Sequence, residues 1–302
     1  MALNLYQLKA FFTVARTRSY TEAAGKLFLT QPAVSHAVAK LGRSVADPLF
    51  KRAPNGMSLT ETGQILYKAC ETVFCELEKA EERVAAVRNK SLGVIRLGAT
   101  VEFGTTFLVK YMKRFMNANP GIHVDFQFRH ELLAPLMRDD LDVIIDCGDH
   151  KAEGLEKLPL FREEYVVIAS PEFLSEHRIK APADLSVCKV LSMDKGGRWW
   201  GNLMNALPQS ARPELKNITE MNHIRGIITA ATEGIGAGFV PKYCVLKELK
   251  ARTLVNVFPG LKLLEDNFYI YQKTWKAGLE RHRRLAAYLK NLKTAGLRLF
   301  KG

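Results

Sequence analysis

Four hydrogen-bonding side chains between residues 30 and 36 form the most informative pattern in this sequence. Thr30, Gln31, Ser35 and His36 stand at the start of a segment whose apolar residues recur at helical spacing, at Ala33, Val34, Ala37, Val38 and Leu41. Short or planar polar groups on the outer face of a helix start, in place of a Glu/Lys mixture, can bond base edges in a DNA major groove. The pattern therefore predicts a DNA-reading helix, with a helical hairpin inside an ordinary α-domain as the alternative.

Neighbouring elements must hold this helix in place. Ser19 and Glu22 have the spacing of a capping box, which predicts a helix that begins near Tyr20. Thr30 is an N-cap candidate for the next helix, and Pro32 stands early in it, where its missing N–H does little harm. A first amphipathic helix precedes both, with apolar residues at Leu5, Leu8, Phe11, Phe12 and Ala15. Three helices around one small core predict a helix-turn-helix unit.

The segment after this unit predicts a β-hairpin. Asn55-Gly56 is a strong turn signal, and a short strand on either side of it would form a wing. Lys51 and Arg52 at the base of the wing are placed to neutralise DNA phosphates, with exposed loop charge as the alternative.

A long helix is predicted from residue 60 to about residue 89. Its apolar residues recur at steps of four and three, at Ile65, Ala69, Val73, Leu77, Ala80, Val84 and Val87. A helix between two domains has little chain of its own to cover such a stripe, so a partner helix from a second subunit is expected. Cys70 and Cys75 lie on this helix and are interpreted as small apolar filler.

The chain beyond residue 91 alternates strands with helices. Strands are predicted at 94–97, 123–128, 142–146, 165–169, 190–193, 217–220, 235–240, 254–257 and 268–272, with a closing amphipathic helix at 279–292. The βαβαβ order predicts a parallel sheet covered by helices. A second α/β unit follows, and the last strands return toward the first. Two lobes crossed twice by the chain create a cleft, a common place for small ligands.

Charge is concentrated at the two ends of the chain. The formal net charge of the 302 residues is +13. Residues 1–58 hold eight Lys and Arg against two acidic residues, and residues 276–302 hold eight against one. A basic N-terminal unit fits a polyanionic partner, whereas the C-terminal charge is interpreted as a solvated helix face.

The cysteines and the hydropathy pattern indicate the compartment. The five cysteines form neither a CxxC pair nor a Cys/His metal spacing, which favours a reducing cytoplasm. The start of the chain lacks a signal-peptide pattern, and no apolar run approaches the roughly 20 residues needed to span a membrane. We therefore expect a cytoplasmic protein with no membrane partner, no metal and no cofactor.

Several motifs resemble those of LysR-type transcriptional regulators. The specific ones are LNLYQLKAFFTVARTRSYTEAAGKL, TQPAVSHAVAKL, PLFKR and LTETG, and the weaker ones are SLGVIRLGAT, NPGIHVDF, LDVIID and GIGAGFVP. The resemblance covers essentially the whole chain. It implies an α/β fold with an N-terminal all-α winged helix-turn-helix at 1–59, a linker and dimerisation helix at 60–90, and a periplasmic-binding-protein-like effector domain at 91–302.

The resemblance also implies the division of the effector domain and its assembly. Lobe I would comprise 91–164 and 266–302, and lobe II would comprise 165–265. Family members are homodimers through the linker helix and usually homotetramers built as dimers of dimers. A small-molecule co-inducer in the inter-lobe cleft changes how they bend double-stranded DNA.

Nine residues are predicted to contact DNA: Tyr20, Thr30, Gln31, Pro32, Ser35, His36, Lys40, Lys51 and Arg52. By the resemblance, Gln31, Pro32, Ser35 and His36 belong to the recognition helix, and Arg52 to a phosphate contact of the wing. His36 stands where many members have Arg, and it lacks the guanidinium fork used on guanine. Gly42 and Ala46-Asp47 replace the family's usual Glu and Leu-Gly, and we expect a looser helix end and turn there.

Twelve residues are predicted to line the effector site: Thr100, Val101, Glu102, Phe103, Asp146, Cys147, Asp149, Met193, Asn222, His223, Gly236 and Phe239. By the resemblance, Thr100 takes the place of a ligand-touching Ser or Thr. Each of the twelve is alternatively a strand-end or cap residue without ligand contact. A helix start usually favours an anion, but Glu102, Asp146 and Asp149 oppose one. We expect a ligand with a cationic or donor group, or a neutral ligand.

Three other functions are alternatives to a transcription regulator. An enzyme is opposed because no Ser/His/Asp order, phosphate loop or HExxH motif is present, and GIGAG is too short and wrongly placed for a dinucleotide fingerprint. A solute-binding protein fits the α/β half but not the basic helical N-terminus. A peroxide sensor needs two suitably placed cysteines, whereas Cys147, Cys188 and Cys244 are widely spaced. We predict a sequence-specific DNA-binding transcription regulator modulated by an effector, and not an enzyme.

Overall fold

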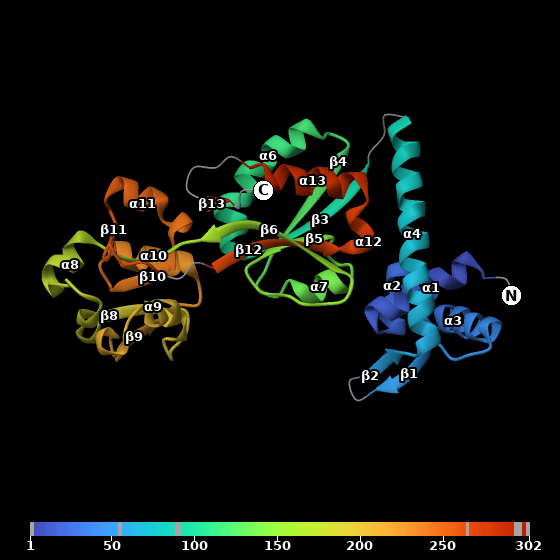
Figure 1. Cartoon of the computed structure of the whole chain (residues 1–302), viewed down its shortest axis with the longest axis horizontal. Helices are drawn as coiled ribbons and strands as arrows, with labels where there is room; N and C mark the ends of the chain where they lie inside the picture. Colours follow the sequence, from blue (N-terminus) through green and yellow to red (C-terminus); the bar gives the residue numbers. More distant parts are fainter. Residues whose placement is uncertain (1–2, 54–55, 88–91, 264–265, 293–297, 300–302) are drawn as a thin grey trace.

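The computed structural model describes residues 3–53, 56–87, 92–263, 266–292 and 298–299. A small helical unit lies at one end of a long helix, α4, and two α/β lobes extend to the side of this helix (Figure 1). The predicted turn residue Asn55 and the predicted end of the long helix at about residue 89 lie outside the described residues.

The N-terminal unit contains α1 (Leu5–Thr17), α2 (Tyr20–Leu27) and α3 (Gln31–Val45). The Ser19 hydroxyl accepts a hydrogen bond from the Glu22 N–H at 3.2 Å, and the predicted start of α2 is confirmed. Phe28 ends α2 in the left-handed conformation, with φ of 55°, and this residue makes the tight turn before α3. The three helices bury a single core, which includes Leu8, Phe11, Phe12, Ala23, Val34 and Leu41.

Strands β1 (Phe50–Ala53) and β2 (Gly56–Leu59) pair antiparallel and form the predicted wing. Before the wing, α3 continues through Gly42 and ends at Ala46, which has the left-handed φ of 58°. The looser helix end expected at Gly42 is therefore not observed: α3 stays helical to Val45, and the left-handed residue Ala46 ends it.

The long helix α4 (Glu61–Val87) has two different faces. One face packs on its own chain and includes Leu66, Cys70 and Cys75, so both cysteines are buried as apolar residues. The other face exposes the predicted stripe at Ile65, Val73, Leu77 and Val84. The described residues of the chain therefore leave this stripe uncovered.

Lobe I is built on a six-stranded sheet in the order β13-β6-β12-β5-β3-β4. Its elements are β3 (Gly93–Ala99), α5 (Val101–Phe103), the π-helical turn η1 (Gly104–Leu108), α6 (Val109–Ala118), β4 (Ile122–Phe128), α7 (Leu133–Met137), β5 (Val143–Asp146), β6 (Leu155–Glu163), β12 (Asp266–Lys273), α12 (Thr274–Ala277), α13 (Glu280–Lys290) and β13 (Arg298–Leu299). Strands β3, β4 and β5 are parallel as predicted, whereas β12 runs antiparallel to β5 and β6.

The sequence pattern missed strand β6. Pro159 lies inside it, and proline removes a ladder donor, so a strand is not expected at this position. The register between β6 and β12 shifts next to this residue, between Phe268 and Tyr269. This irregularity accommodates the proline within a long strand.

Lobe II is built on a five-stranded sheet in the order β11-β7-β10-β8-β9. Its elements are β7 (Tyr165–Ala169), α8 (Pro171–His177), η2 (Pro182–Val187), β8 (Lys189–Ser192), η3 (Arg198–Trp200), α9 (Gly201–Ala206), η4 (Gln209–Ala211), β9 (Asn217–Glu220), α10 (Ile224–Thr232), β10 (Ala237–Pro241), η5 (Lys242–Cys244), α11 (Leu246–Ala251) and β11 (Val255–Asn256). The chain crosses between the lobes from β6 to β7 and returns from β11 to β12. Phe103 and Phe161 of lobe I and Ile227 of lobe II belong to one buried cluster, so the lobes share a core.

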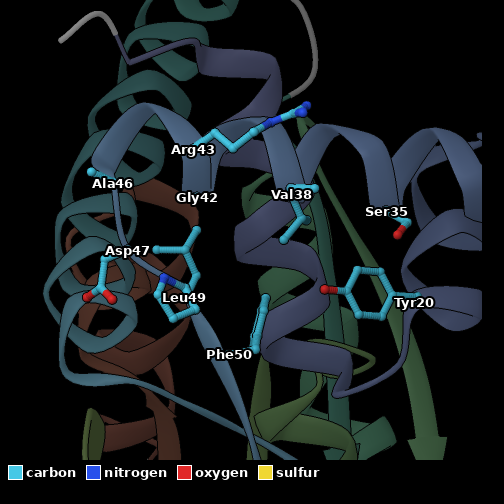
Figure 2. A pocket seen from close by; sticks show the side chains of 11 residues that line it. Tyr20, Ser35, Val38, Gly42, Arg43, Ala46, Asp47, Leu49 and Phe50 are labelled. Atoms are coloured by element: carbon cyan, nitrogen blue, oxygen red, sulfur yellow. The ribbon is translucent and has the colours of Figure 1, made fainter.

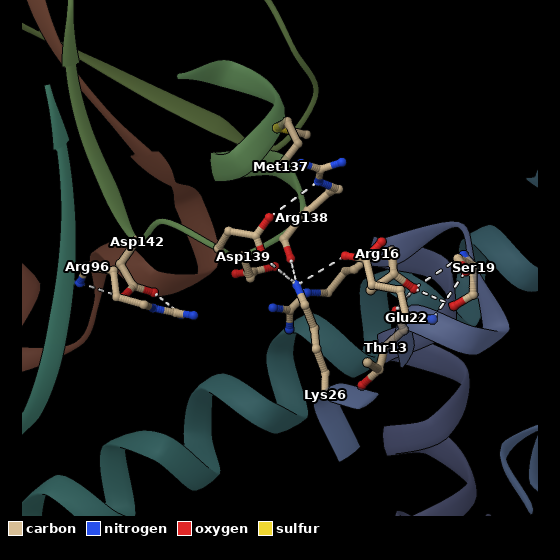
Figure 3. Close-up of polar contacts among 12 residues, drawn as sticks. Thr13, Arg16, Ser19, Glu22, Lys26, Arg96, Met137, Arg138, Asp139 and Asp142 are labelled. Carbon is tan, nitrogen blue, oxygen red and sulfur yellow. Dashed lines mark hydrogen bonds and ion pairs between the residues drawn. The ribbon is translucent and has the colours of Figure 1, made fainter. Parts of the chain in front are cut away.

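Ion pairs join the helical unit to lobe I. Arg16 of α1 pairs with Asp139 (Figure 3). Lys26 Nζ of α2 lies 2.7 Å from Asp140 Oδ1. The Asp139 side chain is only 1% exposed and also pairs with Lys276 Nζ at 2.7 Å. Because a buried carboxylate needs these partners, the contact defines how α1 meets lobe I.

Candidate nucleic-acid interface and effector pocket

Helix α3 presents a polar face to solvent at its start. The Thr30 hydroxyl caps the helix by accepting a hydrogen bond from the Ala33 N–H at 3.4 Å. The buried face consists of Val34, Ala37, Val38 and Leu41. The outer face carries Gln31, Pro32, His36 and Lys40, which are exposed, and Ser35, which is half-buried. A helix with this division of residues can enter a major groove without exposing its core.

A groove of ≈ 600 Å³ lies between α3, the start of α2 and the segment before β1. Figure 2 shows the Tyr20 ring beside Ser35, with Arg43 further along α3. Burial raises the pKa of Tyr20, so its hydroxyl stays protonated and can donate to an acceptor. Arg43 lines this groove but was not among the residues predicted to contact DNA. It lies two four-residue steps after Ser35, and this helical spacing places both residues on one face of α3.

The wing carries two exposed cations. Lys51 and Arg52 of β1 lie opposite Ser58 and Met57 of β2. Consecutive strand residues point to opposite faces, so the two cations flank the wing on both sides. A wing placed in a minor groove would therefore present one cation to each of the two phosphate walls.

Three of the twelve predicted effector residues line one pocket between the lobes. This pocket has a volume of ≈ 500 Å³ and includes Val101, Glu102 and His223. One wall comes from α5, η1 and the start of α6, and the other comes from the start of α10, η5 and α11. The sequence pattern missed all of its other lining residues: Thr105, Thr106, Phe107, Lys110, Tyr111, Ile224, Arg225, Ile228, Tyr243, Cys244, Leu246, Lys247 and Glu248.

The predicted residues at the end of β5 do not line this pocket. Asp146 Oδ2 lies 2.6 Å from His150 Nε2, and Asp149 pairs with Lys157. Cys147 between them is exposed. Thr100 stands at the N-cap of α5 without a side-chain capping bond. These groups lie at the carboxyl end of the parallel strands, where the sequence pattern expected them.

Four other predicted residues serve packing in this structure. Phe103 and Phe239 are fully buried, and Met193 packs against the core shared by the lobes. A Cβ added at Gly236 would lie 2.8 Å from the Lys189 carbonyl oxygen, so close strand packing accounts for this glycine. Asn222 is exposed next to His223.

A buried carboxyl group lies where the chain first crosses between the lobes. Glu163 is 2% exposed, and its Oε2 accepts a hydrogen bond from the Tyr165 hydroxyl at 2.7 Å. Burial raises the pKa of Glu163 to about 8, with the Asp266 charge adding to the effect. The group therefore holds a proton in the folded state at neutral pH.

Replacing Glu163 with Gln is expected to stabilise the protein at pH 8 but not at pH 5. Between the ordinary Glu pKa and 8, the unfolded state releases a proton that the folded state keeps, so wild-type stability falls as pH rises through this window. Glutamine cannot ionise and still accepts the Tyr165 hydrogen bond. A gain of about 2–4 kcal/mol at pH 8 is expected from urea unfolding. The exposed Glu176→Gln variant is the control, and an equal gain at both pH values would contradict the assignment.

Comparisons with known proteins agree with this division of the chain. Residues 5–64 match the family model described as "Bacterial regulatory helix-turn-helix protein, lysR family", and residues 88–293 match "LysR substrate binding domain". The chain is 29% identical to the glycine cleavage system transcriptional activator of Escherichia coli K12 over 88% of this chain and 86% of the relative. It is 30% identical to the HTH-type transcriptional regulator PerR of the same organism, over 84% and 82%.

Solved structures share the fold at lower identity. ArgP from Mycobacterium tuberculosis has a TM-score of 0.68 at 18% identity, covering 95% of this chain and 96% of that one. Full-length LysG from Corynebacterium glutamicum, described with bound effector Arg, has a TM-score of 0.67 at 17% identity with the same coverage.

A winged helix-turn-helix, a long helix and a two-lobed α/β domain define a DNA-binding regulator that responds to a small molecule. The chain belongs to the LysR family of transcriptional regulators. It is a sequence-specific DNA-binding transcription regulator whose DNA binding is modulated by an effector between the two lobes. No helix in the described part of the chain is long and apolar enough to cross a membrane.

Proposed function

We propose that α3 reads the major groove through Gln31, Pro32, Ser35 and His36, and that Tyr20, Thr30, Lys40 and the two wing cations hold the DNA backbone. The observation that carries this proposal is the exposed polar face of α3 beside an exposed basic wing. Two such units in a symmetric dimer would read an interrupted palindrome of the T-(many)-A type, with half-sites separated by whole helical turns.

Replacing Gln31 or Ser35 with Ala is expected to change sequence preference more than total DNA affinity. A specific side-chain contact is worth about 1–3 kcal/mol of discrimination at the base it meets. Selection of bound sites from random DNA, followed by titration with the selected sites, measures this. Gln64→Ala, an exposed change on α4, is the matched control. Unchanged preference in both α3 variants would show that other residues read the bases.

The oligomer proposed here is a homodimer through α4, assembled further into a tetramer. The exposed stripe on α4 supports the dimer, because the described residues of the same chain leave it uncovered. The domain limits proposed are 1–59, 60–90 and 91–302, with lobe II at 165–265. Cytoplasmic location and absence of catalytic activity complete the proposal.

The effector site proposed for this chain is the inter-lobe pocket that includes Val101, Glu102 and His223. Its volume of ≈ 500 Å³ is within the range that holds small molecules. Ligand binding there would bias how the lobes sit together, and lobe I carries the ion pairs to α1 and α2. The LysG structure has an effector with a cationic group. A cationic or donor group is also the chemistry expected from Glu102, which lines this pocket, whereas Asp146 and Asp149 do not.

A further inference from the structure

The inter-lobe pocket contains a buried carboxyl oxygen to which the described residues donate no hydrogen bond. Glu102 lines the pocket, and its Oε1 atom is buried with no hydrogen-bond partner among the described residues. A buried carboxylate oxygen without a donor is costly, so a donor from outside the chain would stabilise this arrangement. Tyr243 lines the same pocket, and the Glu102 charge adds to burial in raising the pKa of Tyr243.

The rim of the same pocket is cationic. Lys110 and Lys247 line it, and neither has a carboxylate partner among the described residues. Arg225 is already paired with Glu248 at 2.8 Å. His223 Nδ1 accepts a hydrogen bond from the Arg225 N–H at 3.1 Å, which leaves Nε2 as the donor of the neutral ring. His223 and Arg225 stand at the start of α10, where a helix favours an anion, whereas Lys110 belongs to α6 and Lys247 to α11.

Apolar side chains also line the pocket. They include Phe107, Ile228 and Leu246. The wall that carries Glu102 includes the π-helical turn η1, a distortion that is common at ligand sites. The pocket therefore offers a carboxylate, an apolar stretch and a group of cations to a single ligand.

From this arrangement we propose that the effector is a small zwitterion whose cationic group and carboxylate are separated by a short aliphatic chain. This inference rests on the proposed function, since it assigns a ligand class to the same pocket. The cationic end donates to Glu102, and the carboxylate accepts from Lys110, Lys247 and the start of α10. A dication would place a second cationic group beside the rim lysines, and a dianion would place a carboxylate beside Glu102. Both ligands would therefore be disfavoured by repulsion between like charges.

A matched series of five-carbon probes tests the ligand class. Calorimetric titration of the full-length protein with 5-aminopentanoate, pentane-1,5-diamine and glutarate varies only the end groups. We expect 5-aminopentanoate to bind at least about 10-fold more tightly than the other two. Tighter binding of the diamine or of glutarate, or no binding of any probe, would overturn the proposal.

Variants locate the binding site. Glu102→Gln is expected to weaken 5-aminopentanoate binding at least about 10-fold, because it removes the charge and keeps the shape. Glu176→Gln on α8 makes the same chemical change on an exposed surface and should have no effect. Thermal unfolding establishes that both variants fold. Unchanged affinity in Glu102→Gln would overturn the assignment of the cationic end.

A blocking variant separates the ligand class from the choice of pocket. Thr105→Trp places a large ring at the pocket wall. If 5-aminopentanoate binds this variant as tightly as wild type, the pocket is not its site and both proposals fail. If glutarate alone binds wild type and Thr105→Trp abolishes that binding, the pocket stands as the effector site and only the zwitterion class is wrong. DNA binding by both proteins is measured in parallel.

Discussion

Glutamates placed at Val73 and Val84 are expected to convert the protein into monomers and to lower operator affinity at least about 100-fold. Val73 is 39% exposed and Val84 is 57% exposed, although both are apolar residues of a long helix. A second α4 covering this stripe would bury them, and two buried carboxylates facing their symmetry mates would oppose that packing. Analytical ultracentrifugation measures the association, and a fluorescence titration with operator DNA measures the affinity.

Two control variants distinguish a lost interface from a damaged helix. Gln64→Glu adds a carboxylate to the exposed surface of α4 outside the stripe, and it should leave the oligomer intact. Val73→Leu with Val84→Leu keeps the stripe apolar and should preserve affinity. If the double glutamate variant stays oligomeric with wild-type affinity, α4 is not the dimer interface.

The large effect on DNA affinity follows from geometry. The stripe from Ile65 to Val84 extends along about 28 Å of helix, so a partner helix can bury it over several turns. The opposite face of α4 is occupied, because Leu66 and Cys70 join the core of the helical unit. One helix thus supports the DNA-binding unit on one side and offers a dimer surface on the other. Loss of the dimer separates the two half-site contacts.

The DNA-binding half was largely predictable because its determinants are local. A cap such as Ser19 acts on a donor three residues away, and the buried positions of α3 repeat every three or four residues. The same periodicity located the stripe of α4. The backbone of this half departs from the prediction where the chain leaves α3, since a left-handed Ala46 is not expected from a residue with a Cβ.

The effector half was predictable in architecture but less so in its site. Strand ends that share one sheet edge were identified, and Glu102 and His223 do line one pocket. Other wall residues come from η1, η5 and α11, which meet only when the lobes pack together. The residue spacing within each segment does not indicate which segments of the two lobes come into contact, so Thr106, Lys110 and Lys247 were missed.

Long-range ion pairs were beyond prediction for the same reason. Lys26 reaches a carbonyl oxygen 112 residues away, at Arg138, and also pairs with Asp140. Arg16 was counted as part of a basic unit that fits DNA, yet its guanidinium faces the buried Asp139. A charge count gives the sign of the net charge of a unit, whereas tertiary packing decides which cations remain free to contact phosphate. The exposed cations of the wing are the clearest remaining candidates for phosphate contacts.

Replacing both Lys51 and Arg52 with Ala is expected to weaken binding to operator and to random DNA alike, by at least about 10-fold near physiological salt. Both side chains are exposed on β1, and phosphate contacts carry no base preference. A dimer would lose four cations, so the slope of log affinity against log salt should become shallower by about 3–4. Fluorescence titrations at several salt concentrations measure both quantities.

The matched control removes the same charge from the other half of the chain. Lys113→Ala on α6 with Lys290→Ala on α13 also takes away two exposed cations per subunit. If net charge alone attracted DNA, both double variants would lose affinity and slope equally, because long-range attraction depends on total charge. Direct phosphate contact by the wing predicts that only the Lys51 and Arg52 variant changes the slope, since counterions are released only where cations meet the backbone. Equal slopes in the two variants would therefore show that the wing does not contact DNA. The assignment of α3 would be unaffected, because it is tested separately by the sequence preference of the α3 variants.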